Sequence, residues 1–251
     1  MTKVRAKKNL GQHFLLDKNI AKKIVDLLDC KHNNVLEIGP GMGILTDILI
    51  AKKLNLTTIE IDEESVYFLK SRYSEKSIRI IQADFLKINL SDYFNSQISI
   101  IGNFPYNISS QILFKVFENK NKITQLTGMF QMEVAERICA LNGRKRGILS
   151  VFIQAFFHVK YCFTVHENVF NPIPKVKSAV IKIKRNNRKE LNCNESKFIE
   201  IVKSAYNHRR KTLRNSLKKF NLDHLKLNEI LKKRAEDLSI EDFIIITKNV
   251  K

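Results

Sequence analysis

The stretch Val35-Leu-Glu-Ile-Gly-Pro-Gly-Met-Gly43 decides the fold. Its first four residues predict a short buried strand, and the apolar spacing of residues 44–53 predicts a helix after the glycines. Glycine lets the backbone turn tightly and approach a ligand closely. A dinucleotide loop has the spacing GxGxxG, whereas here the third glycine comes one residue early. The loop therefore argues against NAD and favours a cofactor without a pyrophosphate, although a purely structural turn remains an alternative.

Strands and helices alternate outward from this stretch. We expect strands at 56–61, 78–82 and 98–101, and helices at 19–28 and 63–73. Such alternation predicts a parallel, doubly wound sheet. Two later β-rich runs, 159–165 and 179–183, suggest an antiparallel hairpin at the edge of the sheet. The polar stretch that begins at Arg185 predicts a boundary between domains at 1–185 and 186–251, the second of them small and helical.

The charge of the chain points to a polyanionic partner. The 251 residues include 44 Lys+Arg against 25 Asp+Glu, and the net charge is +19. Such a balance favours nucleic acid or an anionic membrane, although a Lys-rich proteome would also raise it. No apolar run approaches the length of a membrane span, and no secretory signal is present, so we expect a cytoplasmic protein. The scattered cysteines (Cys30, Cys139, Cys162 and Cys193) argue against a zinc site or a disulfide framework, and we expect no metal.

Two acidic residues follow predicted strands. Glu60 ends the second strand, where its carboxylate can accept both hydroxyls of a ribose. Asp84 follows the third strand, where it can accept the amino proton of an adenine ring. Either acid alone could be a helix N-cap or a loop residue. Together with Gly39 and Gly41, their order along the chain predicts a nucleoside-containing cofactor.

The motif Asn103-Phe-Pro-Tyr106 ends the fourth strand and predicts the chemistry. The exocyclic nitrogen of adenine is a poor nucleophile, and two hydrogen-bond acceptors on its amino group would help it. We expect the Asn103 side-chain oxygen and the Pro105 carbonyl to be those acceptors, and Tyr106 to stack on the base. An ordinary Asn-x-Pro turn is the alternative.

These residues resemble the KsgA-type rRNA adenine dimethyltransferases over nearly the whole chain. The shared motifs are NLGQHFL from Asn9, EIGPGMG, IEID, QADFL, NFPYNISS, FNPIPKVKSA from Phe170 and HRRKTLRNSL from His208. The resemblance implies a Rossmann-like class I methyltransferase domain, with a mostly parallel seven-stranded sheet and a small C-terminal all-α domain. It also implies S-adenosylmethionine as cofactor and dimethylation of N6 on two adjacent adenosines near the 3′ end of small-subunit rRNA.

Carried over by position, the resemblance assigns the site. His13 and Leu15 would contact the methionine end of the cofactor, Asn103 would meet the transferring methyl group, and Phe170 would be a second aromatic near the target base. Gly39, Glu60 and Asp84 keep the roles given above. His13 stands where Asn is usual in the family, and Phe104 stands where an aliphatic residue is usual.

Two other readings stay open, and both involve RNA. One is a 23S rRNA methylase of the macrolide-resistance type, against which the RRKTLRNSL run argues. The other is a ribosome-assembly factor whose methylation is secondary. We expect a monomer that binds 16S rRNA in an immature small subunit and binds no membrane.

Three groups of basic residues are expected to follow the RNA backbone. The first is the N-terminal arm, with Lys3, Arg5, Lys7 and Lys8, and the second comprises Lys182, Lys184, Arg185, Arg188 and Lys189. The third lies in the first helices of the small domain, where we expect Arg209, Arg210 and Lys211 to contact RNA.

Overall fold

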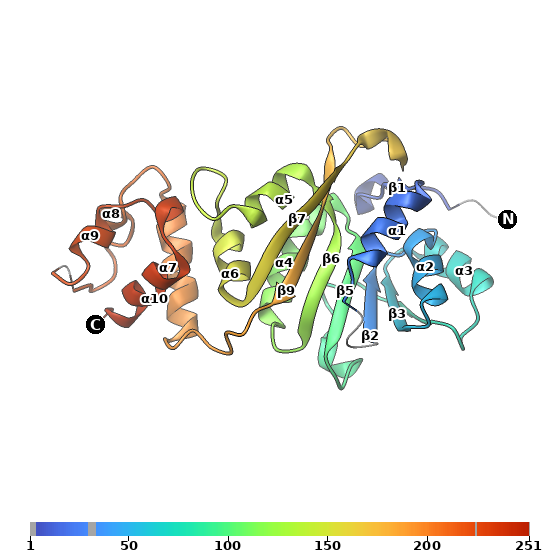
Figure 1. Ribbon diagram of the computed structural model, residues 1–251, viewed down its shortest axis with the longest axis horizontal. Helices are drawn as coiled ribbons and strands as arrows, with labels where there is room; N and C mark the ends of the chain where they lie inside the picture. Colours follow the sequence, from blue (N-terminus) through green and yellow to red (C-terminus); the bar gives the residue numbers. More distant parts are fainter. Residues whose placement is uncertain (1–3, 30–33, 224, 251) are drawn as a thin grey trace. The chain divides into compact units, whose positions relative to one another are not determined.

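The computed structural model describes residues 4–29, 34–223 and 225–250 (Figure 1). Contacts divide the chain into two compact units, 1–135 with 159–185, and 136–158 with 186–251. The sequence placed one boundary after residue 185, with 136–158 in the first domain. Contacts instead group 136–158 with the C-terminal helices, because Phe152 packs on Phe198 there with ring centroids 6.4 Å apart.

A seven-stranded sheet forms the centre of the first unit, in the order β4-β3-β2-β5-β6-β9-β7. Neighbours from β4 to β6 run parallel, and β9 runs antiparallel to β6. The mostly parallel seven-stranded sheet is thus confirmed. The two later β-rich runs are neighbours at the edge of the sheet, as expected, with β7 as the edge strand and β9 between it and β6. The strands are β2 (Asn34–Ile38), β3 (Asn55–Glu60), β4 (Arg79–Gln82), β5 (Ile98–Asn103), β6 (Ile123–Gln131), β7 (Phe157–Val165) and β9 (Ser178–Arg185).

The strand order reverses between β2 and β5, as Figure 1 shows. From β2 the chain builds outward through β3 and β4, and from β5 it builds the other way through β6. Ligands of doubly wound sheets bind at such a switch point, beyond the carboxyl ends of the strands. In the central strand β5, Ile98, Ile100 and Ile101 are fully buried, as expected of a strand covered on both faces.

Helices connect and flank the strands of the first unit (Figure 1). Asp17 caps the first of them by accepting hydrogen bonds from the backbone of Asn19 and Ile20, as an N-cap aspartate does. The helices are α1 (Lys18–Asp26), α2 (Ile44–Ala51), α3 (Glu63–Arg72) and α4 (Ser109–Glu118), with short 3-10 turns at η1 (Lys8–Leu10), η2 (Leu90–Asp92), η3 (Tyr106–Ile108) and η4 (Glu167–Val169). The helix α5 (Met132–Cys139) begins in the first unit and ends in the second.

A second, two-stranded sheet pairs β1 (Phe14–Leu15) antiparallel with β8 (Phe170–Asn171). The sequence analysis did not predict it, because strands of two residues leave no periodic pattern. This pairing fixes the N-terminal segment next to the glycine-rich loop, since Phe14 lies against Gly41.

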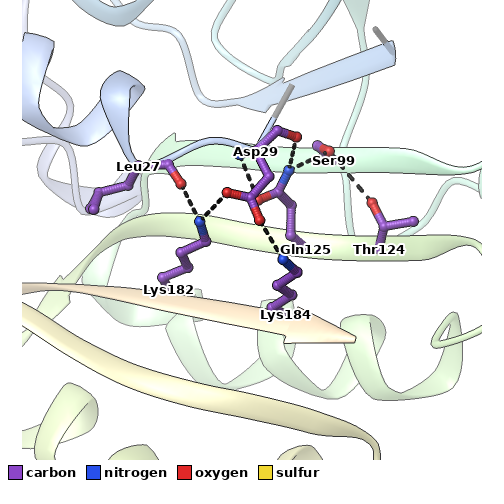
Figure 2. Close-up of polar contacts among 7 residues, drawn as sticks. All are labelled: Leu27, Asp29, Ser99, Thr124, Gln125, Lys182 and Lys184. Atoms are coloured by element: carbon purple, nitrogen blue, oxygen red, sulfur yellow. Dashed lines mark hydrogen bonds and ion pairs between the residues drawn. The ribbon is translucent and has the colours of Figure 1, made fainter. Parts of the chain in front are cut away.

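A polar cluster lies where the parallel strands begin (Figure 2). Lys182 and Lys184 of β9 donate to the two carboxylate oxygens of Asp29 at 2.7 and 2.6 Å. The Gln125 side chain bonds the backbone of Asp29 in both directions, at 3.1 and 2.7 Å, and also reaches Ser99. The two lysines hold the pKa of Asp29 at about 2, below its usual value. The cluster ties the end of α1 to β5, β6 and β9.

The second unit is helical in its described part. Its elements are α6 (Ile148–Phe156), α7 (Glu195–Asn207), α8 (Leu213–Ser216), α9 (Asn228–Leu231), η5 (Ala235–Asp237) and α10 (Ile240–Lys248). Phe198 and Phe243 are fully buried and pack edge to face in its core. No helix among the described residues has the length and apolarity needed to cross a membrane. Cys139, Cys162 and Cys193 form no disulfide with one another, and Cys30 lies outside the described residues.

Candidate active site

The glycine-rich loop joins β2 to α2 at the switch point. Gly39, Gly41 and Gly43 all adopt positive φ values, of 66°, 54° and 82°. A side chain at Gly41 would also bring its Cβ within 2.9 Å of the Phe14 ring, so no larger residue fits. The turn predicted from the sequence is confirmed by these positive φ values, which glycine adopts readily.

Glu60 ends β3 and is 4% exposed. One carboxylate oxygen accepts from the Gly41 N–H at 3.1 Å, and the other accepts from Ile61 and Asp62 at 2.9 and 3.0 Å. Burial raises the pKa of Glu60, and these three N–H donors oppose the rise. A carboxylate has about four acceptor positions, so roughly one remains for a ligand hydroxyl. Glu60 therefore holds the glycine loop as well as facing the site.

Asp62 is a site residue that the sequence analysis missed. It is 2% exposed and accepts from Lys7 Nζ, from Gln12 Nε2 at 3.2 Å and from Ser65 Oγ at 2.9 Å. Burial alone would raise the pKa of Asp62, but its bonds to Lys7, Gln12 and Ser65 lower it. These bonds fasten residues 7–12 beside the loop. Lys7, expected in the RNA-binding arm, is thus engaged within the chain, and Lys3 lies outside the described residues.

Asn103 ends β5, and its amide has a defined orientation. Its Nδ2 donates to the His13 carbonyl at 2.8 Å. Because a carbonyl can only accept, the nitrogen must face His13, and the Asn103 oxygen is left to accept from another group. His13 is fixed in turn, since its Nδ1 bonds the Pro172 carbonyl at 2.7 Å. The departure from Asn at position 13 leaves this backbone contact intact.

Tyr106 completes one wall of the site. Its ring stacks on His13 with centroids 5.3 Å apart and an interplanar angle of 26°. Its hydroxyl bonds Ser178 Oγ at 2.5 Å. Burial raises the pKa of Tyr106, which keeps the phenol neutral. The stacked pair offers a flat aromatic surface next to the Asn103 amide.

These residues line two adjoining cavities. The first holds about 50 Å³ and brings together seven of the predicted residues, His13, Gly39, Gly41, Glu60, Asn103, Pro105 and Tyr106. The second is lined by Leu15, Gly39 and Asn103 together with Glu37, a residue that the sequence analysis did not single out. Burial raises the pKa of Glu37 to about 8, and Thr46 donates to it at 2.7 Å. A charged residue inside an apolar strand was the available signal for Glu37.

The backbone carbonyls of Phe104 and Pro105 differ in their hydrogen-bond partners. The Pro105 carbonyl, expected to accept from adenine, already accepts from Ile108 N and Ser109 Oγ at 3.3 and 3.1 Å. Both bonds lie at the start of α4, where the backbone N–H groups of the first turn have no acceptor within the helix. Within the described residues, the Phe104 carbonyl accepts no hydrogen bond. The structure therefore offers Phe104, rather than Pro105, as the carbonyl that is not yet engaged.

The Phe104 side chain points into the core and is 1% exposed. It packs on Phe130 with centroids 4.8 Å apart. A Cβ at Gly102 or Gly128 would lie 2.8 or 2.2 Å from its ring, so the two glycines provide its space. The bulky ring at this position is thus accommodated in the core, although the residue itself borders the first cavity.

Asp84 lies outside the lining of both cavities. Its Oδ1 accepts from Leu86 N at 2.9 Å, and its backbone carbonyl accepts from Lys87 and Ile88 at 3.0 and 3.3 Å. The turn 84–88 therefore begins at Asp84, whose side chain is 27% exposed. Phe85 beside it is 4% exposed.

Two predicted RNA contacts have other surroundings than expected. Phe170 is 2% exposed and belongs to the apolar core, so its ring does not face the site. Residues 208–212 form a turn between α7 and α8 rather than a helix, since this polar run has no apolar spacing. In that turn, Arg209 donates to the carbonyls of Arg144 and Arg146 at 2.5 and 3.0 Å and pairs with Glu236. Arg210 and Lys211 are exposed.

The cluster at Lys182–Lys189 is largely paired. Lys182 and Lys184 bind Asp29, and Arg188 pairs with Glu241. Arg185 Nε donates to the Lys120 carbonyl at 3.0 Å. Counting positive residues along the sequence therefore overstated the charge that this segment leaves for RNA.

Comparison with known proteins identifies the family of the chain. A family model described as ribosomal RNA adenine dimethylase matches residues 3–251. The ribosomal RNA small subunit methyltransferase A of Flavobacterium johnsoniae is 54% identical, and the alignment covers 100% of this chain and 97% of that protein. The corresponding protein of Bacteroides thetaiotaomicron is 51% identical over 100% of this chain and 96% of its own length.

Solved structures agree on the fold. A dimethyladenosine transferase from Plasmodium falciparum has a TM-score of 0.80 and 26% identity, over 93% of this chain and 96% of that one. The 23S rRNA methyltransferase ErmE has a TM-score of 0.73 and 24% identity, over 94% and 99%. The second likeness shows the fold alone. The Rossmann-like class I methyltransferase fold expected from the sequence is confirmed.

Proposed function

Because the chain belongs to the ribosomal RNA adenine dimethylase family, we propose that it dimethylates N6 of two adjacent adenosines in the 3′-terminal hairpin loop of 16S rRNA. The methyl donor is S-adenosylmethionine, which supplies the methyl group in activated form on a sulfonium. The enzyme acts on an immature small ribosomal subunit, as a monomer, and so takes part in the biogenesis of that subunit.

The orientation of the Asn103 amide carries this proposal. Its nitrogen is bound to the His13 carbonyl, so its oxygen is directed to accept from an amino group. The Phe104 carbonyl is the second acceptor, in place of Pro105, whose carbonyl already has two donors. Two acceptors on the amino hydrogens localise the nitrogen lone pair, and holding the base in line contributes about 7–11 kcal/mol.

The cofactor is held by residues of the glycine loop and the two flanking strands. The backbone at Gly39, where an added Cβ would meet only Pro105 at 3.9 Å, accommodates it closely, and the remaining acceptor position of Glu60 takes a ribose hydroxyl. Asp84 accepts from the adenine amino group. His13 and Leu15 line the methionine end, since both border the cavities that Asn103 also borders.

The target adenosine must leave its base stack to reach Asn103, because a paired base hides its amino group. Tyr106, stacked on His13, provides the surface that receives it. Arg210 and Lys211 contact the RNA backbone from the second unit, because both side chains are exposed. Phe170 would need to leave the core to touch the base, so we assign it no contact.

Mapping of labelled methyl groups on unmodified ribosomal particles tests the function. The full chain is incubated with labelled S-adenosylmethionine and with small-subunit or large-subunit particles. We expect label on two adjacent adenosines near the 3′ end of 16S rRNA. Label on 23S rRNA would support the macrolide-resistance type of enzyme instead. Tight binding to the small subunit without methyl transfer would support an assembly factor.

A further inference from the structure

Lys115 is a buried lysine that the proposed mechanism does not use. It lies on α4, the helix that begins directly after the reaction motif, and is 8% exposed. Its Nζ donates to the carbonyls of Leu86 and Ile88 at 3.0 and 2.5 Å. The same ammonium lies over the Phe85 ring, 5.1 Å from the centroid. All three contacts fall on the turn 84–88.

The turn 84–88 needs such a partner at its end. Asp84 closes its beginning by accepting from Leu86, Lys87 and Ile88. The carbonyls at the end of a single turn have no partners within the turn itself. Lys115 supplies donors to two of them, and an ammonium has three donors and no acceptor. Asp84 and Lys115 therefore fix the turn from its two ends.

The surroundings of Lys115 also include the negative charge of Asp84. Burial lowers the pKa of Lys115, whereas the negative charges of Glu118 and Asp84 raise it. Among the described residues, no carboxylate lies within ion-pair distance of this lysine. Its burial thus has a cost that carbonyl bonds and the Phe85 ring offset. A methionine of similar length would fill the space at lower cost, so packing alone does not explain a lysine here.

We infer that Lys115 is a positioning residue for the adenine subsite, holding the turn 84–88 so that Asp84 accepts from the amino group of the cofactor's adenine. This inference rests on the proposed function, in which Asp84 has that role. Since η3 joins the reaction motif to α4, Lys115 also links the segment that holds the target base to the segment that holds the cofactor.

Binding of two product analogues tests the inference without RNA. S-adenosylhomocysteine carries the adenine amino group, and S-inosylhomocysteine has an oxygen in its place. By calorimetry, the wild-type chain should prefer the first by about tenfold or more, since a carboxylate cannot accept from that oxygen. In Lys115→Met the Kd for S-adenosylhomocysteine should rise about tenfold, and the preference should shrink to within about threefold. Lys115→Arg keeps the charge and the donors and should retain most of the preference.

The matched control is Lys122→Met. Lys122 also donates to a backbone carbonyl, that of Phe94 at 2.7 Å, and to Ser91 Oγ, but it does not touch the turn 84–88. The affinity of Lys122→Met for S-adenosylhomocysteine and its preference over S-inosylhomocysteine should stay within about twofold of the wild type. If Lys115→Met does not fold, Lys115→Gln, which keeps two N–H donors on a shorter side chain without the charge, takes its place.

The possible outcomes distinguish a failure of the inference about Lys115 from a failure of the proposed function. If Lys115→Met binds both analogues more weakly but keeps the full preference, Lys115 is merely structural and the inference is overturned. If the wild type binds S-adenosylhomocysteine without any preference, Asp84 does not read the amino group, and the inference fails with that assignment. If the wild type binds neither analogue, the proposed function itself fails.

Discussion

At the carboxyl ends of the parallel strands, polar groups are held in place by the backbone with acceptor positions left over. Asn103 has its nitrogen bound and its oxygen available, and Glu60 receives three N–H donors. At the amino ends, Asp29, Gln125, Lys182 and Lys184 bind one another and the nearby backbone (Figure 2). The first arrangement leaves hydrogen-bond acceptors for a ligand, whereas the groups of the second arrangement bind one another within the chain. Substitutions at the two ends should therefore change different properties.

Asn103→Ala should give the largest effect on activity. Loss of an acceptor that acts on the reacting nitrogen costs a factor of roughly 10²–10³ in kcat, by analogy with the removal of one transition-state hydrogen bond. The melting temperature should change little, because the Asn103 side chain holds the described structure through one hydrogen bond, to the His13 carbonyl. Single-turnover methyl transfer and a thermal melt measure the two quantities.

Asn89→Ala is the matched control for this substitution. Asn89 is a surface residue that accepts from Ser91 at the start of η2, away from both cavities. Its turnover should equal that of the wild type. Near wild-type turnover in Asn103→Ala would show that other groups hold the amino nitrogen.

Glu60→Gln should weaken cofactor binding by roughly 1.5–3 kcal/mol, because a charged acceptor is lost. Unlike Asn103→Ala it should also lower the melting temperature, since the amide has one acceptor oxygen for the three N–H groups that Glu60 now receives. Calorimetry with S-adenosylmethionine beside a thermal melt checks both. Unchanged affinity together with a lower melting temperature would reduce Glu60 to a residue that holds the loop.

The sequence predicted those parts of the site that are local in the chain. Glu60 and Asn103 are the last residues of their strands, and Gly39 and Gly41 lie just beyond the end of β2. A strand end is visible from a few residues. Asp62 and Lys7 are 55 residues apart, and nothing local marks them as partners. Phe14 and Asn171 are even farther apart in the sequence, and their pairing rests on two short strands.

Two basic residues of equal charge need not be equally available to bind RNA. Arg209 and Arg210 are adjacent and identical in type, yet Arg209 bonds two carbonyls and Glu236, while Arg210 is exposed. Which of them is engaged depends on the segments that fold around them, residues 144–146 and 236. The same holds for Phe170, whose core position follows from the pairing of β8 with β1.

Asp29→Asn should destabilise the chain without changing activity at neutral pH. The pKa of Asp29 falls from 3.8 to about 2 on folding, which corresponds to at most about 2.5 kcal/mol. The carboxylate is 33% exposed, so about 1–2 kcal/mol is expected after screening. Because the folded pKa is the lower one, the stabilisation is complete above about pH 4 and is lost as the pH falls toward 2.

Thermal melts of the wild type and Asp29→Asn across this range provide the measurement. The difference in melting temperature should be constant from about pH 5 to 7 and should narrow between about pH 4 and 2. A difference that does not depend on pH would mean that the shape of the side chain matters and its charge does not.

The smallest expected effect concerns RNA binding and compares two pairs of basic residues directly. Arg210→Gln with Lys211→Gln removes two exposed charges, and the slope of log affinity against log salt for a single strand should fall by about 1.4, at roughly 0.7 per contact. Lys182→Gln with Lys184→Gln removes the same charge from the paired cluster on Asp29. That slope should stay unchanged, while the melting temperature should fall because Asp29 loses both partners. Each double variant lowers the net charge of +19 by two, so long-range attraction is matched. An equal change of slope in both double variants would mean that RNA binding depends on the total charge of the chain and not on which charges are exposed.

Arg209→Gln refines this comparison. It should lower the melting temperature with little change of slope, since Arg209 already donates to the carbonyls of Arg144 and Arg146.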